Sequence, residues 1–121
     1  MKDRFKTIRK GLKEILYIDY TGLDKNTEKE FIKLIDEATN VVLKRGNNQL
    51  ILYNVENSYG SPAIVAKMKA DANKSKHLVS KQAVLGITGA KAILLKGINL
   101  FAKIDIKPFS TEEEAIKWLL S

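Results

Sequence analysis

The sequence contains no cysteine, a single histidine, two prolines and three arginines among its 121 residues. Without cysteine the chain can form no disulfide framework, no thiol nucleophile, no cysteine-ligated zinc site and no iron–sulfur cluster. No apolar run approaches the roughly 18–20 residues that span a bilayer. The opening residues, MKDRFKTIRK, also lack the hydrophobic stretch of a signal peptide. We therefore expect one domain over residues 1–121, located in the cytoplasm and without a transmembrane segment.

Groups that could carry out catalysis are also scarce. The histidine, His77, lies in a lysine-rich segment at the end of a predicted helix, where its charge would favour the helix dipole. No G-x-S-x-G nucleophile motif accompanies it. The acidic run 112–114 fits the first turn of a helix better than a metal site, because metal sites usually cluster such groups with histidine or cysteine. We predict no catalytic residue, no metal, no cofactor and therefore no enzymatic activity.

Positive charge is in excess, with 21 lysines and arginines against 14 acidic residues and a net charge of +7. The excess gathers in residues 1–14, 67–81 and 91–107. Such lysine-rich segments can attract nucleic acid or an anionic membrane surface. They can equally form a solvated surface, because arginine is rare and aromatic residues are not interleaved with the lysines. We expect no specific nucleic-acid partner, and any duplex binding should disappear as salt rises toward physiological strength.

The hydrophobic periodicity predicts an α/β (α+β) domain with the order β-β-α-β-α-β-α-β-α. Strands are predicted over 5–9, 15–20, 49–55, 82–87 and 104–109, and helices over 25–45, 90–102, 110–119 and from 61 through at least 72. Strands separated by helices of this length must lie largely parallel, whereas the first two strands can form a hairpin. The expected architecture is a mixed five-stranded sheet with about four helices.

Three helix starts carry capping signals. Asp24 or Asn26 can cap the first helix, and Ser61, followed by proline, can cap the second. Ser110, with Glu113 three positions later, reads as a capping box for the last helix.

The turn before the third helix contains a G-x-x-G segment, residues 86–89, with Lys91 just beyond it. Thr88 could cap that helix, or its hydroxyl and the local amides could hold an anion. The segment does not match a phosphate-binding loop, and glycine here is explained equally well by a tight turn.

The helix predicted over 90–102 has an unusually wide apolar face. Its apolar side chains cover well over half of the circumference, which is more than one packing surface requires. A neighbouring helix could cover the second side, or that side could meet a partner or a lipid surface. We predict self-association through Leu95 and Leu100, so that replacing either by lysine would shift sedimentation toward monomer.

Two segments carry a family resemblance: AVLGITGAKAILLKGINLFAKIDIKPFSTEEEAIKWL, residues 83–119, and ILYIDYTGL, residues 15–23. They resemble the SpoIIAA-like family of the STAS (sulfate transporter and anti-sigma factor antagonist) superfamily. The resemblance implies a STAS-like fold, with helices packed against a mixed sheet. It implies no catalytic residues, because the family has no established enzymatic activity.

The resemblance also bears on phosphorylation. Anti-sigma factor antagonists carry a phosphoacceptor serine in a D-S-S-G-type loop, and the corresponding loop here is residues 57–61, NSYGS. Tyr59 would then replace the phosphoacceptor, which leaves Ser58 and Ser61 as nearby candidates. Ser61 is explained equally well as a plain N-cap.

Two loops are predicted to meet at one edge of the sheet, because both follow strands that should be parallel. They are residues 57–61 and 86–91, and each precedes a helix whose N-terminus favours negative charge. We predict that this rim binds an acidic partner loop or an anion. Its residues would be Asn57, Ser58, Tyr59, Ser61, Thr88, Gly89 and Lys91.

These observations favour a non-enzymatic regulatory module that binds a protein partner and can form a homodimer. The alternative is a carrier or sensor of a small apolar or anionic ligand, such as a lipid or a nucleotide. A third reading is a membrane-surface or nucleic-acid binder that uses the lysine-rich segments. An elongated internal cavity would favour the carrier, and a closed core with one exposed apolar patch would favour the interaction module.

Overall fold

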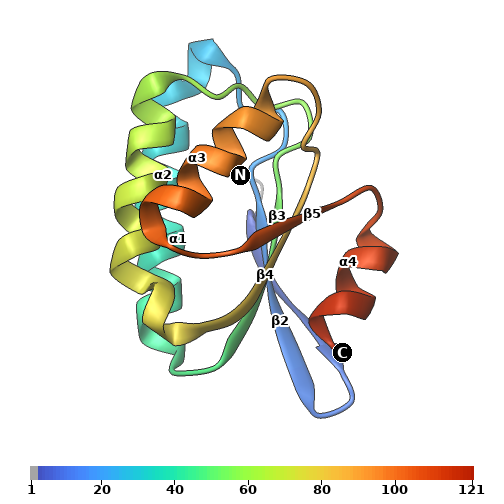
Figure 1. Ribbon diagram of the computed structural model, residues 1–121. Helices are drawn as coiled ribbons and strands as arrows, with labels where there is room; N and C mark the ends of the chain where they lie inside the picture. Colours follow the sequence, from blue (N-terminus) through green and yellow to red (C-terminus); the bar gives the residue numbers. More distant parts are fainter. Residues whose placement is uncertain (1–2) are drawn as a thin grey trace.

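The structure, a computed structural model that describes residues 3–121, contains five strands and four helices within that range (Figure 1). The strands are β1 (Phe5–Lys10), β2 (Lys13–Asp19), β3 (Gln49–Asn54), β4 (Val79–Leu85) and β5 (Ile106–Phe109). The helices are α1 (Glu28–Arg45), α2 (Pro62–Ser75), α3 (Lys91–Ala102) and α4 (Glu112–Leu119). The predicted order of elements and the mixed five-stranded sheet are confirmed.

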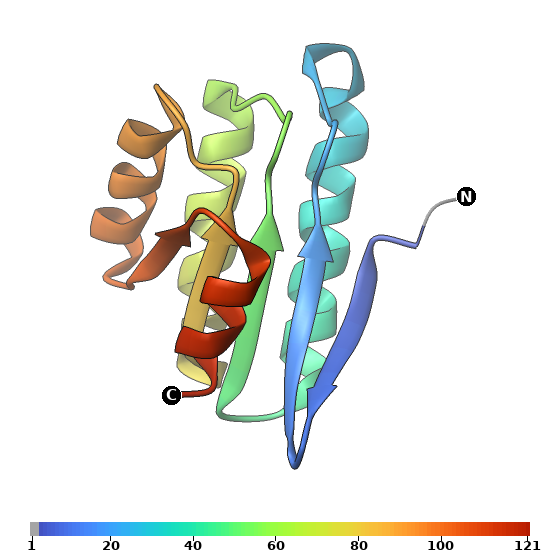
Figure 2. The same ribbon diagram turned by 90° about the vertical axis from the view of Figure 1, so that its right-hand side faces the viewer.

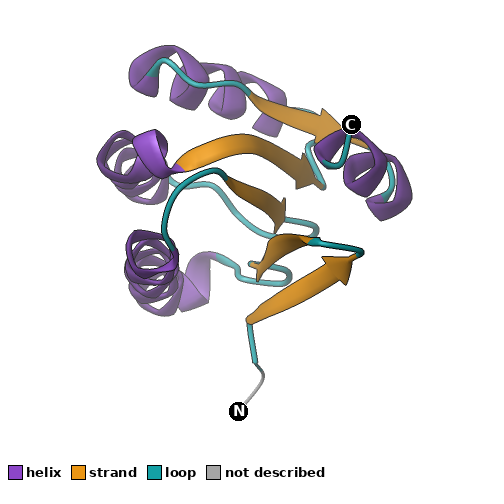
Figure 3. Ribbon diagram, turned by 90° about the horizontal axis from the view of Figure 1, so that it is seen from below, coloured by secondary structure: helices purple, strands orange, loops and turns teal. Residues whose placement is uncertain are grey.

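The sheet follows the order of the chain, β1-β2-β3-β4-β5. β1 pairs antiparallel with β2, and every later pair is parallel. Because each crossover adds the next strand on the same side, α1, α2 and α3 all lie on one face (Figures 1 and 3). The chain then turns after β5 and places α4 alone on the opposite face.

Alternation along the strands divides the core between these two faces. In β2, Leu16 and Ile18 pack toward α1 and α2, whereas Ile15 and Tyr17 pack toward α4. Burying one large apolar side chain contributes about 1.5–3 kcal/mol. Helices α1 to α3 cover a continuous apolar surface of the sheet. Near the β5 edge this surface is completed by Val84, Leu95, Ile98 and Ile106.

The capping predictions are confirmed in part. The Ser61 Oγ accepts a hydrogen bond from the backbone N of Ile64 at 3.1 Å, as predicted. Asp24 caps the 3-10 turn that precedes α1. The cap of α4 is Thr111 rather than Ser110, because its Oγ1 accepts from the backbone N of Glu114 at 3.2 Å. Ser110 and Thr111 are each followed by a glutamate three positions later. The capping-box pattern therefore does not distinguish between these two residues as the cap.

Candidate functional site

The two predicted rim loops do emerge at the same edge of the sheet. β3 and β4 run parallel and end side by side (Figure 2). Beyond the strands, the backbone N of Val55 donates to the carbonyl of Leu85 at 2.9 Å. The next residues approach still more closely, since Gly86 packs directly against the backbone of Glu56. The two loops therefore lie at one edge of the sheet, and that they bind a partner or an anion stays a prediction.

The two serine hydroxyls of the first rim loop are already occupied, whereas Tyr59 is 46% exposed. The Ser58 Oγ donates to the Val55 carbonyl at 2.6 Å, and Ser61, only 6% exposed, caps α2. Phosphorylation at either serine stays a prediction, and it would require the hydroxyl to leave its present partner.

The N-terminus of α3 also offers fewer free donors than expected. The backbone N atoms of Lys91, Ala92 and Ile93 donate to the carbonyls of Thr88, Gly89 and Ala90, each at 3.1 Å. Thr88 and Gly89 themselves are exposed. An anion at this end would have to compete with these main-chain bonds.

Lys91 joins the two loops rather than facing open solvent. Its Nζ donates to the Val55 carbonyl at 2.8 Å and to the Gly86 carbonyl at 3.2 Å. Burial lowers the pKa of this ammonium group, and the nearby Glu56 carboxylate partly opposes that effect. The predicted positive charge is present, but it is used to hold the ends of β3 and β4 together.

An apolar cavity of about 120 Å³ lies between the sheet and the three-helix layer. Its walls come from every element of that face, including Ile18, Tyr53 and Val84 from the strands and Ile64, Met68 and Leu95 from the helices. The rim residues Ser58, Tyr59 and Lys91 line it as well. The predicted rim therefore borders a cavity, and apolar atoms make up most of the cavity wall.

One buried carboxylate belongs to this wall. Asp71 of α2, 5% exposed, accepts a hydrogen bond from the Thr39 Oγ1 at 2.8 Å and pairs with the Lys67 Nζ at 3.2 Å. Lys67 also forms an ion pair with Asp36 of α1. Both carboxylate oxygens of Asp71 are thus engaged, and the network joins α1 to α2.

Sequence reasoning missed Asp71 and Tyr20, another residue of the wall. A signal for Asp71 exists, because it continues the inward stripe of Ile64 and Met68 at helical spacing. A carboxylate on that stripe indicates a buried polar contact. Tyr20 carries no such signal, since an aromatic residue at the end of a buried strand is typical of any core.

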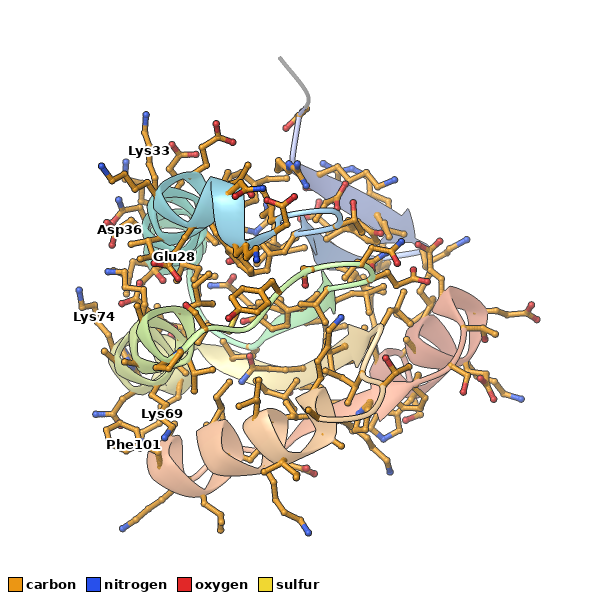
Figure 4. All side chains as sticks on the ribbon, turned by 90° about the horizontal axis from the view of Figure 1, so that it is seen from above. Glu28, Lys33, Asp36, Lys69, Lys74 and Phe101 are labelled. Carbon is orange, nitrogen blue, oxygen red and sulfur yellow. The ribbon has the colours of Figure 1, made fainter. Side chains whose placement is uncertain are left out.

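The two residues predicted to mediate self-association lie in different environments, one buried and one exposed. Leu95 packs in the core with Val84, Ile98 and Ile106, so it is unavailable for a partner. Leu100 is 76% exposed. Ile93 and Phe101 are also exposed, and Lys69 of α2 lies beside the Phe101 ring, with its Nζ 5.8 Å from the ring centroid (Figure 4).

Many lysines of the basic segments are used within the chain. Lys76 donates to the Ala102 carbonyl at the end of α3. Lys13 donates to the Leu120 carbonyl, and Lys81 donates to the Trp118 carbonyl, both at the end of α4. These contacts complement the negative ends of two helices, which gives these three lysines a role within the fold. Within residues 3–121, no helix combines the length and apolarity needed to cross a membrane.

Comparison with known proteins gives the family. A sequence model of the SpoIIAA-like family matches residues 15–120. The fold is similar to the crystal structure of an uncharacterized DUF3478-family protein with a SpoIIAA-like fold from Shewanella loihica PV-4, with a TM-score of 0.65. That pair shares 15% sequence identity over 95% of this chain and 91% of the other. No curated protein sequence matches significantly. The chain therefore belongs to the SpoIIAA-like family of the STAS superfamily.

Proposed function

We propose that this chain is a non-enzymatic regulatory domain that binds a small apolar molecule in the cavity beneath α2 and α3. Family membership supports a regulatory domain in general. The observation that carries the finer proposal is the cavity itself, which is lined mainly by apolar atoms and bordered by the rim loops.

The size of the cavity defines the class of ligand. An apolar cavity of about 150 Å³ is large enough to bind benzene. The cavity here, at about 120 Å³, is somewhat smaller but of the same order, and we propose that it takes a small aromatic ring or a short alkyl chain. The walls favour such a ligand over an anion, because the nearest ammonium groups, Lys67 and Lys91, already have partners.

The position of the cavity links the ligand to a protein partner. α2 and α3 both pack over it, and both begin at the rim formed by residues 57–61 and 86–91. A bound ligand would add contacts beneath these helices and restrain the rim. We propose that a cytoplasmic protein partner recognises the rim in this restrained state.

Filling the cavity should prevent binding. Ala72 of α2 lines the cavity, and we expect Ala72→Leu to weaken toluene binding at least about tenfold, because leucine would occupy the ligand volume. Ala70, exposed on the same helix, provides the matched control, and Ala70→Leu should leave the affinity unchanged. Calorimetric titration of toluene into both variants measures the difference. Equal affinities in the two variants would place the toluene site outside the cavity.

Self-association through α3 is a second candidate, and it is carried by the exposed side chains of Ile93, Leu100 and Phe101. If a second copy covers this surface, Leu100→Lys should shift sedimentation toward monomer without changing stability. Leu95→Lys should instead unfold the domain, because it places a charge in the core. Sedimentation equilibrium at high protein concentration tests this candidate, and a monomeric wild type would exclude it.

A further inference from the structure

Among residues 3–121, the deep part of the cavity wall contains a polar group without a hydrogen-bond partner, the hydroxyl of Tyr20. The residue follows β2 and is 3% exposed. Its ring packs against Phe31 and Tyr53, with centroid distances of 5.1 Å and 6.4 Å. Within residues 3–121 the Tyr20 hydroxyl makes no hydrogen bond, although the residue lines the cavity.

The other polar side chains deep in the wall are all satisfied. The Tyr53 hydroxyl donates to the Gln82 Oε1 at 3.0 Å. The Thr39 hydroxyl donates to the Asp71 carboxylate, and the Ser75 hydroxyl donates to the Asp71 carbonyl at 3.0 Å. Buried hydroxyl groups normally have a hydrogen-bond partner, because leaving one unpaired is costly. The Tyr20 hydroxyl is therefore the group of this inner wall that remains open to a ligand.

We propose that Tyr20 anchors the ligand, which is a small, uncharged, largely apolar molecule with a single oxygen function, such as a phenol or a short alcohol. This inference rests on the proposed function and adds the chemical class of the ligand. A tyrosine hydroxyl can both donate and accept, so it matches a ligand hydroxyl in either direction.

The charges around the cavity argue for a neutral ligand. The nearby Asp71 carboxylate would repel an anionic group, and its Lys67 partner also pairs with Asp36. A cationic ligand would bring a charged group into walls that are mainly apolar, and both Asp71 oxygens already have a partner, Thr39 and Lys67. A single neutral oxygen fits both the wall and the hydroxyl.

Phenol and toluene provide a matched pair of probes, since they differ only in a hydroxyl against a methyl group. We expect Tyr20→Phe to weaken phenol binding about tenfold while leaving toluene binding unchanged, as for the loss of one buried hydrogen bond. Tyr53→Phe is the control, because it removes a hydroxyl that already bonds to Gln82. It should leave the ratio of the phenol and toluene affinities as in the wild type. Affinities come from titrations followed by amide chemical shifts.

The outcomes separate this inference from the function on which it rests. If neither probe binds the wild type in the cavity, the proposed function fails and the inference fails with it. If both probes bind but Tyr20→Phe weakens neither, or weakens both equally, the anchor is wrong while the cavity remains a binding site.

A second measurement covers the case in which Tyr20→Phe does not fold. In a crystal of the wild-type protein soaked with phenol, the ligand oxygen should lie about 2.7–2.8 Å from the Tyr20 Oη. A phenol oxygen directed elsewhere in the cavity would overturn the proposal.

Discussion

Above about pH 10.5, Tyr20 and Tyr53 together should lower the free energy of unfolding by about 2.7 kcal/mol for each pH unit. Burial raises the pKa of both phenols well above the ordinary value of 10.0. The unfolded chain ionises these tyrosines near pH 10, whereas the folded protein keeps both protonated. Stability is therefore fully present below pH 10 and is lost as the pH rises toward the pKa values of the folded state.

Lys91 opposes this trend over a limited range. Burial lowers the pKa of its ammonium group below 10.5, so the folded protein releases this proton earlier than the unfolded chain does. The contribution of Lys91 to the free energy of unfolding therefore rises with pH between its pKa in the folded protein and pH 10.5. Above pH 10.5 this contribution no longer changes. The full effect of the tyrosines should appear above about pH 10.5.

Urea unfolding at several pH values between 9 and 11.5 measures the slope. Tyr20→Phe and Tyr53→Phe should each remove about 1.4 kcal/mol per pH unit from it, because each deletes one proton that the folded state retains. A wild-type stability that stays level through this range would show that the two phenols ionise in the folded protein.

Replacing Gly86 by alanine should lower the free energy of unfolding by about 3–4 kcal/mol. The residue has a φ of +92°, which L side chains rarely adopt, and a Cβ would lie 2.5 Å from the backbone N of Glu56. Because the crowding atom belongs to the backbone, relief requires the two rim loops to separate.

Gly89 is the matched control for this prediction. It also has a positive φ, +55°, but a Cβ there would meet nothing within 4 Å. Gly89→Ala should therefore cost only about 1–2 kcal/mol, which is the cost of the backbone conformation alone. Urea denaturation measures the loss of free energy of unfolding in both variants, and the difference between the two losses is the cost of the close contact between the loops. Equal losses of stability would contradict it.

The order of elements was predictable because each element carries its own local signal. The strand 15–20 is almost continuously apolar, the helix 25–45 has helical spacing, and Ser61 with Pro62 marks a helix start. Parallel pairing then follows from the helices between the strands, and it brings the rim loops to one edge. Apolar runs, helical spacing and capping residues all depend on neighbouring positions in the chain, so they can be recognised from the sequence alone.

The cavity was not predictable in the same way, because the space inside a core depends on how side chains from distant elements fill it. Gly60 illustrates this, since a Cβ there would meet the Leu94 Cδ1 at 2.8 Å, a contact between the loop before α2 and helix α3. Lys91 is similar. Its place in the chain indicated a free charge, but only the folded structure brings the Val55 and Gly86 carbonyls within reach.

The apolar face of α3 shows that helical periodicity does not determine which apolar side chains are buried. Leu95 and Leu100 belong to the same wide apolar arc, and periodicity assigns both to a packing surface. α3 lies beyond α2 on its face of the sheet, so α2 covers one flank and the outer flank stays exposed. Tertiary position, not local sequence, decides which leucine is buried.

A titration with toluene that follows the methyl groups of both cores tests the central claim most directly. The Met68 and Ile64 methyl groups line the cavity, whereas those of Leu52 and Leu119 lie in the core under α4. We expect saturable shifts of the Met68 and Ile64 methyl signals while those of Leu52 and Leu119 stay in place. Shifts confined to the α4 core, or no saturable shift in either core, would contradict a ligand-binding cavity beneath α2 and α3.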